Sequence, residues 1–474
     1  MKNFISTCFK AAVIILTTAF ISYSCSNDGD EDYTLAFTSP AIFFNFGETQ
    51  SAPLNASGNV HSLTVSSKPA GWEAEINETA GTVKITAPDS LDDTEDDNGS
   101  SVTPDASGTL VIRGYVGESI VSASLYLSLG DVVDMAGQYA NSYILTAPLT
   151  AYRISAARPD GSAIENVASV NIVWQTARYL VRYPEYKNGK ITFVTYENNG
   201  ELLEGNALLA AYDANDNILW CWHLWVTGCN PEENAVELNG HSFMGCNLGA
   251  FGNSTGSNDE ILASYGLYYQ WGRPSPMPRP RYFDCAGSSS EAIYSANISS
   301  ITMSVEEADG DNNTISAAIS NPLMFVTGLE SPWSSAGESW SDQRKSNYDP
   351  CPAGWRVPDE SAFEGLTIVG DELAAELESL RKAYGWTLTD GSQSAFFFAG
   401  GRRTYTDGSV INMNTAETPQ PWEGFYWTAS LASSHAKAAG LYFDLDTDDA
   451  TASRLSTGRE LQLSNGLQVR CVRE

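Results

Sequence analysis

The stretch "CPAGWRVPDESAFEGL", residues 351–366, has a backbone that prolines restrict at several positions. Cys351 lies between two prolines, and a third proline, Pro358, is followed at once by two acidic residues. Proline suits the first turn of a helix and acidic side chains complement the helix dipole, so a helix is predicted to begin at Pro358. A cysteine fixed this firmly also raises the question of its partner elsewhere in the chain.

The segments around this stretch predict a C-terminal α+β domain over residues 241–474. A second helix is indicated between Asp371, as its cap, and Gly385, as its stop, because apolar residues recur there at helical spacing. Strands are predicted after it at residues 395–403, 424–430, 440–446 and 466–474. The proline cluster within 266–285 is incompatible with helix or central strand and predicts a fixed surface loop.

The N-terminal half is predicted to be β-rich throughout. Over residues 34–132, short alternating segments at regular intervals indicate an Ig-like antiparallel β-sandwich. Residues 133–240 form a second β-rich section that leads into the C-terminal domain. The expected strands of both sections are 63–67, 72–76, 82–87, 108–116, 119–129, 170–175, 190–196, 206–212 and 217–226.

The strand at residues 217–226 crowds Trp220, Trp222 and Trp225 around His223. Stacking of sugars on this array is one interpretation. We favour a buried packing ladder, because large aromatic residues supply much of a small core. His223 is then a hydrogen-bonded structural histidine.

The first residues indicate where the protein works. Residues 1–24 have the charged start and short apolar run of a secretory signal peptide, and that run is too short to span a bilayer. Cys25 follows directly, as the acylated cysteine of a bacterial lipoprotein does, and residues 25–33 form an acidic tether that resembles the export signal of Bacteroidota-type surface lipoproteins. We therefore expect a lipoprotein on the outer face of the outer membrane, attached to the membrane through lipid alone. A plain secreted protein is the alternative.

Charge and cysteine content narrow the possible ligands. The formal net charge of −32 argues against binding to nucleic acid through the general field of the protein. Six cysteines lie beyond the lipoprotein segment, and an even number in an oxidising compartment favours three disulfides, with many possible pairings. Zinc is the rival interpretation, but no C-x-x-C pair occurs and the histidines are scattered. We expect no metal and no cofactor.

The acidic stretch "DLDTDDAT", residues 444–451, is reminiscent of a calcium loop. It lacks the glycine at the sixth position and the glutamate at the twelfth position of such loops. A solvated hairpin tip is the favoured interpretation.

Six motifs in one order carry a family resemblance: "ILWCWHLWVT", "NLGA", "GLYYQWGR", "DPCPAGWRVP", "YWTAS" and "GLQVRCVRE". Together they resemble the bacterial "major paralogous domain" proteins, whose fold is related to C-type lectins and to sulfatase-modifying factors. The match covers roughly residues 217–474. Behind a lipoprotein signal and an Ig-like module, such a C-type-lectin-like domain resembles the tip or adhesion subunits of surface fimbriae.

The resemblance also implies disulfide pairings. In lectin-like folds a cysteine near the first helix pairs with one in the last strand, and Cys351 and Cys471 match those positions. The four remaining cysteines are additions with which this sequence departs from the family. We expect them to form two local bridges, Cys221–Cys229 by proximity and Cys246–Cys285 by elimination.

Three functions of different classes follow. The resemblance implies a non-enzymatic adhesion subunit, without catalytic residues, whose partners are other fimbrial subunits and a host or bacterial surface glycan or protein. A glycan-capturing lipoprotein of a nutrient-uptake system would need an exposed aromatic platform, for which Trp333, Trp340 and Trp422 are candidates. An oxidase akin to sulfatase-modifying factors would need a reactive cysteine pair holding copper, whereas every cysteine here has a plausible structural partner.

The recognition surface is predicted on the long C-terminal loops. They combine positive charge with large aromatics, the side chains most often found at binding hot spots. The candidates are Trp333, Trp340, Arg273, Arg279 and Arg281. The alternative is that both tryptophans fold back onto the domain.

Overall fold

The computed structural model describes residues 33–92, 94–95, 101–130, 132–198, 200–282, 290–329, 333, 339–369, 384–411, 422–433, 436–445 and 454–474. The predicted signal peptide, Cys25 and most of the acidic tether therefore lie outside the described residues. The described residues form two compact units: those up to Val133 together with Tyr183–Glu185, and those of Asp134–Arg182 together with Tyr186–Glu474. The predicted middle and C-terminal domains thus share one unit. Within the described residues, no helix has the length and apolar character needed to cross a membrane.

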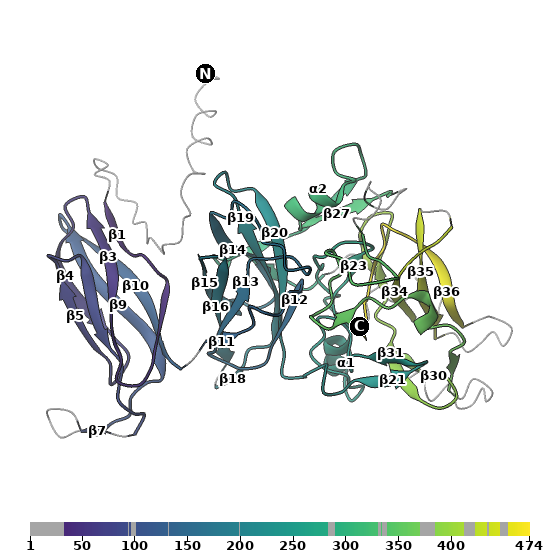
Figure 1. Cartoon of the computed structure of the whole chain (residues 1–474), viewed down its shortest axis with the longest axis horizontal. Coiled ribbons are helices and arrows are strands. Elements are labelled where there is room, and N and C mark those ends of the chain that lie inside the picture. The colour runs from purple at the N-terminus through teal and green to yellow at the C-terminus, as the bar shows by residue number, and fades with distance from the viewer. Residues whose placement is uncertain are drawn as a thin grey trace, which may run out of the picture. The chain divides into compact units, whose positions relative to one another are not determined.

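The first unit is a β-sandwich of two four-stranded sheets (Figure 1). All pairings are antiparallel except that of β2 with β10, which run parallel. One sheet has the order β1 (Thr34–Phe37), β3 (Thr49–Ser57), β6 (Thr82–Thr86), β5 (Glu73–Asn77). The other has the order β2 (Ala41–Phe44), β10 (Ser119–Leu129), β9 (Ser107–Val116), β4 (His61–Ser67). The short pair β7 (Thr94–Glu95) and β8 (Ser101–Val102) lies apart from both sheets.

Alternation along the strands builds the core of this sandwich. On β9, Leu110 and Ile112 are fully buried whereas Thr109 and Arg113 are exposed, as a half-buried strand requires. Trp72 fills the centre, with its ring edge-on to Phe44 at a centroid distance of 5.1 Å. The predicted Ig-like β-sandwich, and the mostly β class, are confirmed for the residues that the structure describes.

The second unit begins with two larger sheets. The four-stranded sheet has the order β11 (Val133–Asp134), β13 (Ala151–Ser155), β16 (Lys190–Thr195), β15 (Val181–Lys187). The six-stranded sheet has the order β12 (Ser142–Leu145), β20 (Ile218–Val226), β19 (Gly205–Tyr212), β14 (Ser169–Gln175), β24 (Ile293–Tyr294), β25 (Ser300–Ile301). A small pair, β17 (Glu197–Asn198) and β18 (Glu201–Leu202), accompanies them.

Strand β20 confirms the predicted packing ladder. Trp220, Trp222, His223 and Trp225 are all buried, so both faces of this strand are covered and neither offers a platform to sugars. The strand runs between β12 and β19, and its tryptophans join the largest apolar cluster among the described residues.

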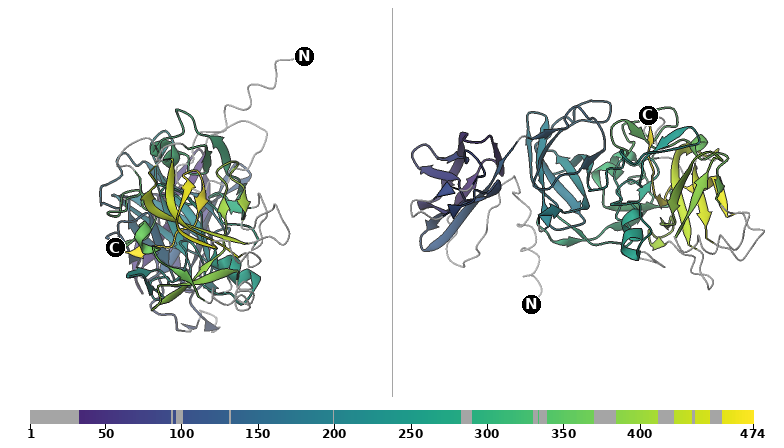
Figure 2. Two further views of the ribbon diagram at one scale, coloured as in Figure 1. Left: turned by 90° about the vertical axis from the view of Figure 1, so that its right-hand side faces the viewer. Right: turned by 90° about the horizontal axis from the view of Figure 1, so that it is seen from below.

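The C-terminal part of this unit consists of small sheets joined by long connections. Their strand orders are β21 (Val236–Leu238), β22 (His241–Phe243), β38 (Val472–Arg473), β28 (Trp355–Arg356); β23 (Tyr269–Gln270), β37 (Gly466–Leu467), β32 (Arg402–Arg403), β33 (Val410–Ile411); β29 (Thr367–Ile368), β30 (Gly385–Thr389), β31 (Ser394–Phe398); β34 (Glu423–Leu431), β35 (Lys437–Asp444), β36 (Leu455–Gln462); and β26 (Ser304–Glu307), β27 (Met324–Thr327). Figure 2 shows the yellow strands β35 and β36 and the teal six-stranded sheet at opposite ends of the unit, with green segments between them.

Helix is scarce in the described residues. Helices α1 (Asn258–Ser264) and α2 (Ile315–Ser320) are short, and neither was predicted from the sequence. The helix predicted from Pro358 is only a 3₁₀ turn, η1 (Glu360–Ala362), because Phe363 and Leu366 turn into the core and the chain enters β29 directly. Of the second predicted helix, residues 371–383 lie outside the described residues.

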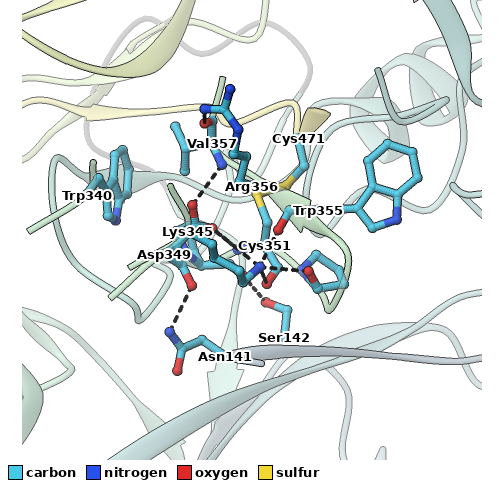
Figure 3. Close-up of a disulfide and its surroundings, with 12 residues drawn as sticks. Asn141, Ser142, Trp340, Lys345, Asp349, Cys351, Trp355, Arg356, Val357 and Cys471 are labelled. Carbon is cyan, nitrogen blue, oxygen red and sulfur yellow. Dashed lines mark hydrogen bonds and ion pairs between the residues drawn. A yellow bond between two sulfur atoms is a disulfide. The ribbon is translucent and has the colours of Figure 1, made fainter. Parts of the chain in front are cut away.

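A disulfide joins Cys351 to Cys471, the pairing that the family resemblance implies (Figure 3). The two Cα atoms are 6.1 Å apart across a sequence separation of 120 residues. Asp349 organises the approach to it: its carboxylate accepts from the backbone N–H groups of Cys351 and Val357, both at 2.9 Å. The tightly fixed stretch therefore anchors one end of the domain to the last strand.

Candidate functional site

The predicted recognition tryptophans are buried. Trp333 is fully inaccessible and its indole N–H donates to the carbonyl of Trp271 at 2.6 Å. Trp340 is 4% exposed and donates to the carbonyl of Tyr348 at 2.9 Å. The prediction of an exposed pair is wrong, because a backbone acceptor satisfies each polar N–H and the rings can then join the core. Trp422 is half-buried and packs edge-on against Tyr384.

Arg273 is also part of the interior rather than of a binding surface. Its side chain is inaccessible, and its guanidinium donates to the carbonyls of Met324 at 2.6 Å and Ala318 at 3.2 Å. These acceptors belong to the C-terminal end of α2 and the chain that follows it, where carbonyls lack helical partners and a cation is favoured. Burial lowers the pKa of Arg273 to about 10, so the side chain remains charged at neutral pH.

Arg279 and Arg281 do not form the predicted basic patch. Arg279 pairs with the carboxylate of Glu291 at 3.0 Å and donates to the carbonyl of Leu262 at 2.7 Å. Burial raises the pKa of Glu291, and the facing guanidinium opposes that shift. Arg281 is exposed and lies over the ring of Tyr282. Of the three arginines, only Arg281 therefore presents its charge to solvent, and the predicted patch is wrong.

The local disulfides do not follow the predicted pairing. Cys221 lies in the middle of β20, where its thiol faces the carbonyl of Ile319 at 4.0 Å. The extended strand from Cys221 to Val226 leads about 17 Å away from Cys221 before the chain reaches Cys229, and both thiols are free. Cys229 instead contacts Cys246. The predicted pair Cys221–Cys229 is thus wrong, and Cys285, the predicted partner of Cys246, lies outside the described residues.

His223 has a serine and an amide partner, but it lies deep in the core. Its Nδ1 is 2.9 Å from the hydroxyl of Ser142 and its Nε2 is 2.8 Å from the side-chain carbonyl of Asn206. Burial lowers the pKa of His223 to about 3, so the imidazole is neutral at pH 7. All three residues are buried. The network therefore joins β12, β19 and β20, which agrees with the predicted structural histidine.

Among the described residues no group of three or more histidine, cysteine or acidic side chains is placed to hold a metal ion. Most of the acidic stretch 444–451 lies outside them, and within it Asp444 accepts from the hydroxyl of Tyr442 at 3.1 Å.

A cavity of about 440 Å³ opens on the middle β section, at the end of the four-stranded sheet. Its floor is apolar and buried, formed by Ala156, Ala157 and Ile164. Its walls carry the polar and aromatic groups: Tyr139, Tyr186, Glu165, Asn166, Asn188 and Lys190. We call this the tyrosine cavity. Its size falls within the range of small-molecule sites in proteins.

The turn at residues 157–163 forms one wall and is firmly held. The buried indole of Trp222 donates to the carbonyl of Ala157 at 3.1 Å. At the tip, Asp160 and Asn347 exchange two hydrogen bonds, of 3.0 and 2.8 Å. Gly161 adopts a left-handed φ of +82°, and the ring of Tyr139 lies directly against it. The wall is therefore fixed by contacts with the core and with the C-terminal part of the unit.

The hairpin that joins β15 to β16 also lines the cavity. Asn188 and Gly189 have φ angles of 52° and 76°, which is the two-residue turn that the Asn-Gly sequence predicts. The carbonyl of Gly189 accepts from the N–H of Ala156 at 2.9 Å, and this bond ties the turn to the floor. The ammonium of Lys190 donates to the hydroxyl of Ser155 at 2.8 Å. The hairpin thereby places one cation at the cavity.

These groups can bind a polyhydroxylated ligand. The rings of Tyr139 and Tyr186 contribute apolar area next to polar lining groups, which suits a molecule with both C–H and O–H groups. The amides of Asn166 and Asn188 donate and accept, the carboxylate of Glu165 accepts, and Lys190 donates. Since the surrounding turns are already hydrogen-bonded, binding would order little additional chain.

Sequence analysis did not identify this cavity. Its turns carry the relevant signals, since Asn188-Gly189 is a typical hairpin-turn sequence and the segment around Gly161 is rich in turn residues. Nothing in the sequence showed that these turns, some 25 residues apart, would enclose one space with Tyr139.

Comparison with known proteins gives little further information. The chain matches no protein-family model and no curated protein. Solved structures with partial likeness include a chimeric titin Z1Z2 fragment, at 14% identity, covering 42% of this chain and 98% of that chain with a TM-score of 0.15. The Bacteroides ovatus mixed-linkage glucan utilization protein SGBP-B, bound to a heptasaccharide, matches at 12% identity over 42% of this chain and 46% of its own, with a TM-score of 0.12. Scores this low carry no argument about this protein.

Proposed function

We propose that this chain is a non-enzymatic cell-surface binding protein that uses the tyrosine cavity to hold a glycan, and that it serves attachment as a fimbrial tip subunit. The observation that carries the binding proposal is the cavity itself, in which Tyr139 and Tyr186 stand beside amide, carboxylate and ammonium groups over an apolar floor. Each group suits recognition of sugar hydroxyls and C–H faces.

The surface location and the fimbrial role rest on the sequence. The lipoprotein-like segment ending at Cys25 supports display on the outer membrane, and the six ordered motifs of residues 217–474 support the tip role. Substitution Cys25→Ala in living cells is expected to abolish incorporation of labelled palmitate and protease-accessible display. If the variant still incorporates palmitate, the anchoring proposal fails.

The burial of the predicted recognition residues in the C-terminal loops favours the middle section as the binding site. With Trp333, Trp340 and Arg273 buried, the described residues of the loops that sequence reasoning favoured offer little for recognition. At the tyrosine cavity, Tyr139 is 40% exposed and Tyr186 is half-buried.

A glycan array probed with the purified chain tests the proposal. Substitutions Tyr139→Ala and Tyr186→Ala should each weaken binding to the retained glycan by roughly thirtyfold, which corresponds to about 2 kcal/mol at an aromatic hot spot. The matched control is Tyr405→Ala, because Tyr405 is 42% exposed and lies away from the cavity lining. Equal affinities of all three variants would refute the cavity as the site.

The role in attachment is tested separately. Cells that display Tyr139→Ala should adhere to host or bacterial surfaces less than cells that display Tyr405→Ala at equal density. If adhesion is unchanged while uptake of the same glycan falls, the protein is instead a glycan-capturing lipoprotein of nutrient uptake.

A further inference from the structure

The four-stranded sheet β21–β22–β38–β28 gathers the ends of the C-terminal domain, and the Cys351–Cys471 disulfide closes only half of it. Cys351 precedes β28 and Cys471 precedes β38, so that bridge joins these two neighbouring strands. The other two strands, β21 and β22, form a hairpin in which Val236 pairs with Phe243. Phe243 in turn pairs with Val472 of β38.

Cys229 and Cys246 lie at the open end of that hairpin. Beyond the paired strands, the N–H of Gly245 donates to the carbonyl of Pro231 at 2.9 Å, which keeps the two chain segments together. Cys229 is two residues before Pro231 and Cys246 is one residue after Gly245. Their side chains meet there, with the thiol of Cys246 donating to the sulfur of Cys229.

The two thiols differ in access and in ionisation. Cys246 is 2% exposed whereas Cys229 is half-buried. The hydrogen bond from Cys246 lowers the pKa of Cys229 to about 7, and the same contact, with burial, raises the pKa of Cys246. An accessible thiolate beside a buried thiol is the arrangement in which the first attacks and the second resolves, because only the thiolate is nucleophilic.

We propose that Cys229 and Cys246 form a second disulfide of the mature protein, made by thiol–disulfide exchange and placed on the same sheet as Cys351–Cys471. Each bridge then closes one half of the sheet. The segment between the two cysteines contains the β21–β22 hairpin. It also contains Glu232, whose carboxylate accepts from the indole N–H of Trp355 at 2.7 Å, beside the first bridge.

The oxidant in this reaction is an external disulfide. The Cys229 thiolate attacks one sulfur of that disulfide, a mixed disulfide forms, and one external thiol leaves after taking up a proton. Cys246 then loses its proton and its sulfur attacks the sulfur of Cys229, which expels the second external thiol. Two protein thiols are oxidised and one external disulfide is reduced to two thiols.

Peptide mapping of the full-length protein tests the product. Protein isolated from cell envelopes without reductant is denatured in N-ethylmaleimide, digested and analysed by mass spectrometry. We expect a linked peptide pair that contains Cys229 and Cys246 and that separates on reduction. Cys221→Ser is the matched control and should keep this pair. Alkylation of both Cys229 and Cys246 before reduction, or a link from either to Cys285, would overturn the proposal.

A second measurement follows the reaction itself. Purified protein is reduced at Cys229 and Cys246 and then exposed to glutathione disulfide. The Cys246→Ser variant should accumulate a stable glutathione adduct on Cys229, whereas the unsubstituted chain should pass to the internal disulfide. The Cys229→Ser variant should react at least tenfold more slowly at Cys246, which is buried. Equal rates for the two variants, or a persistent adduct in the unsubstituted chain, would contradict the assigned roles.

Discussion

The C-terminal loops and the tyrosine cavity use similar side chains to opposite ends. In the loops, the indole N–H of Trp333 donates to a backbone carbonyl, and the guanidinium of Arg273 donates to backbone carbonyls and to the side chain of Gln270. Both side chains are inaccessible. At the cavity, the tyrosine Tyr139 and the cationic Lys190 line an open space. The comparison shows that aromatic and cationic content does not mark a binding surface. What separates the two regions is whether the surrounding backbone leaves acceptors that these groups can satisfy internally.

If this contrast is correct, breaking the C-terminal region should cost stability and leave the cavity intact. The largest loss is expected from the double substitution Cys351→Ala with Cys471→Ala. A loop of this length contributes about 4–5 kcal/mol in the chain-entropy model. Urea unfolding of the oxidised protein measures the difference. In the fraction that remains folded, glycan affinity should equal that of the unsubstituted chain, and a parallel loss of affinity would show that the two regions are coupled.

Substitution Arg273→Met should cost about 3–5 kcal/mol, because it leaves buried carbonyls at the end of α2 without a donor. Arg281→Met is the matched control, since Arg281 is exposed, and it should change the free energy of unfolding by less than about 0.5 kcal/mol. Equal stability of the two variants would mean that Arg273 is not the structural residue that its contacts indicate.

The free energy of unfolding should depend on pH through the buried His223. Its folded pKa of about 3 lies below the ordinary value of 6.5, so the neutral imidazole stabilises the fold above pH 6.5. This stability is lost as the pH falls from 6.5 toward 3, by about 1.4 kcal/mol per pH unit. The loss amounts to roughly 3 kcal/mol at pH 4.5. Urea unfolding at pH 7 and pH 4.5 measures it. The His223→Gln variant should show a shallower pH dependence, whatever its stability at pH 7, and an unchanged slope would assign the acid sensitivity to other groups.

The strands were the most predictable part of the structure, because alternation in a half-buried strand is a property of the local sequence. The nine strands predicted before residue 230 all occur within one or two residues of the expected bounds. Strand β3, which contains Pro53, was missed, since proline argues against a strand interior. Helix α1 was missed although Ser257 and Glu260 form the local signature of a helix start.

The sites were far less predictable, because burial is decided by residues distant in sequence. The exposure of Trp333 depends on a carbonyl of Trp271, and the enclosure of the cavity depends on turns around Gly161 and Gly189. The Cys351–Cys471 pairing was accessible through the family resemblance, whereas the contact of Cys229 with Cys246 depends on the β21–β22 hairpin, which the sequence did not indicate.

The smallest effect should come from the Asp160–Asn347 contact, which ties the wall of the cavity to the C-terminal part of the same unit. Hydrogen bonds from Ser162 and then Asn347 lower the pKa of Asp160, so its carboxylate stabilises the fold above the ordinary aspartate range and the effect is lost as the pH falls through the lower folded pKa. Asp160 is exposed and solvent screens it, so Asp160→Ala should cost no more than about 0.5 kcal/mol. The loosened turn should lower glycan affinity by about twofold and speed hydrogen exchange at the N–H groups of Gly161 and Ile164. Asp92→Ala, another exposed aspartate, is the control, and identical exchange at both amides in the two variants would mean that the turn holds its shape without this contact.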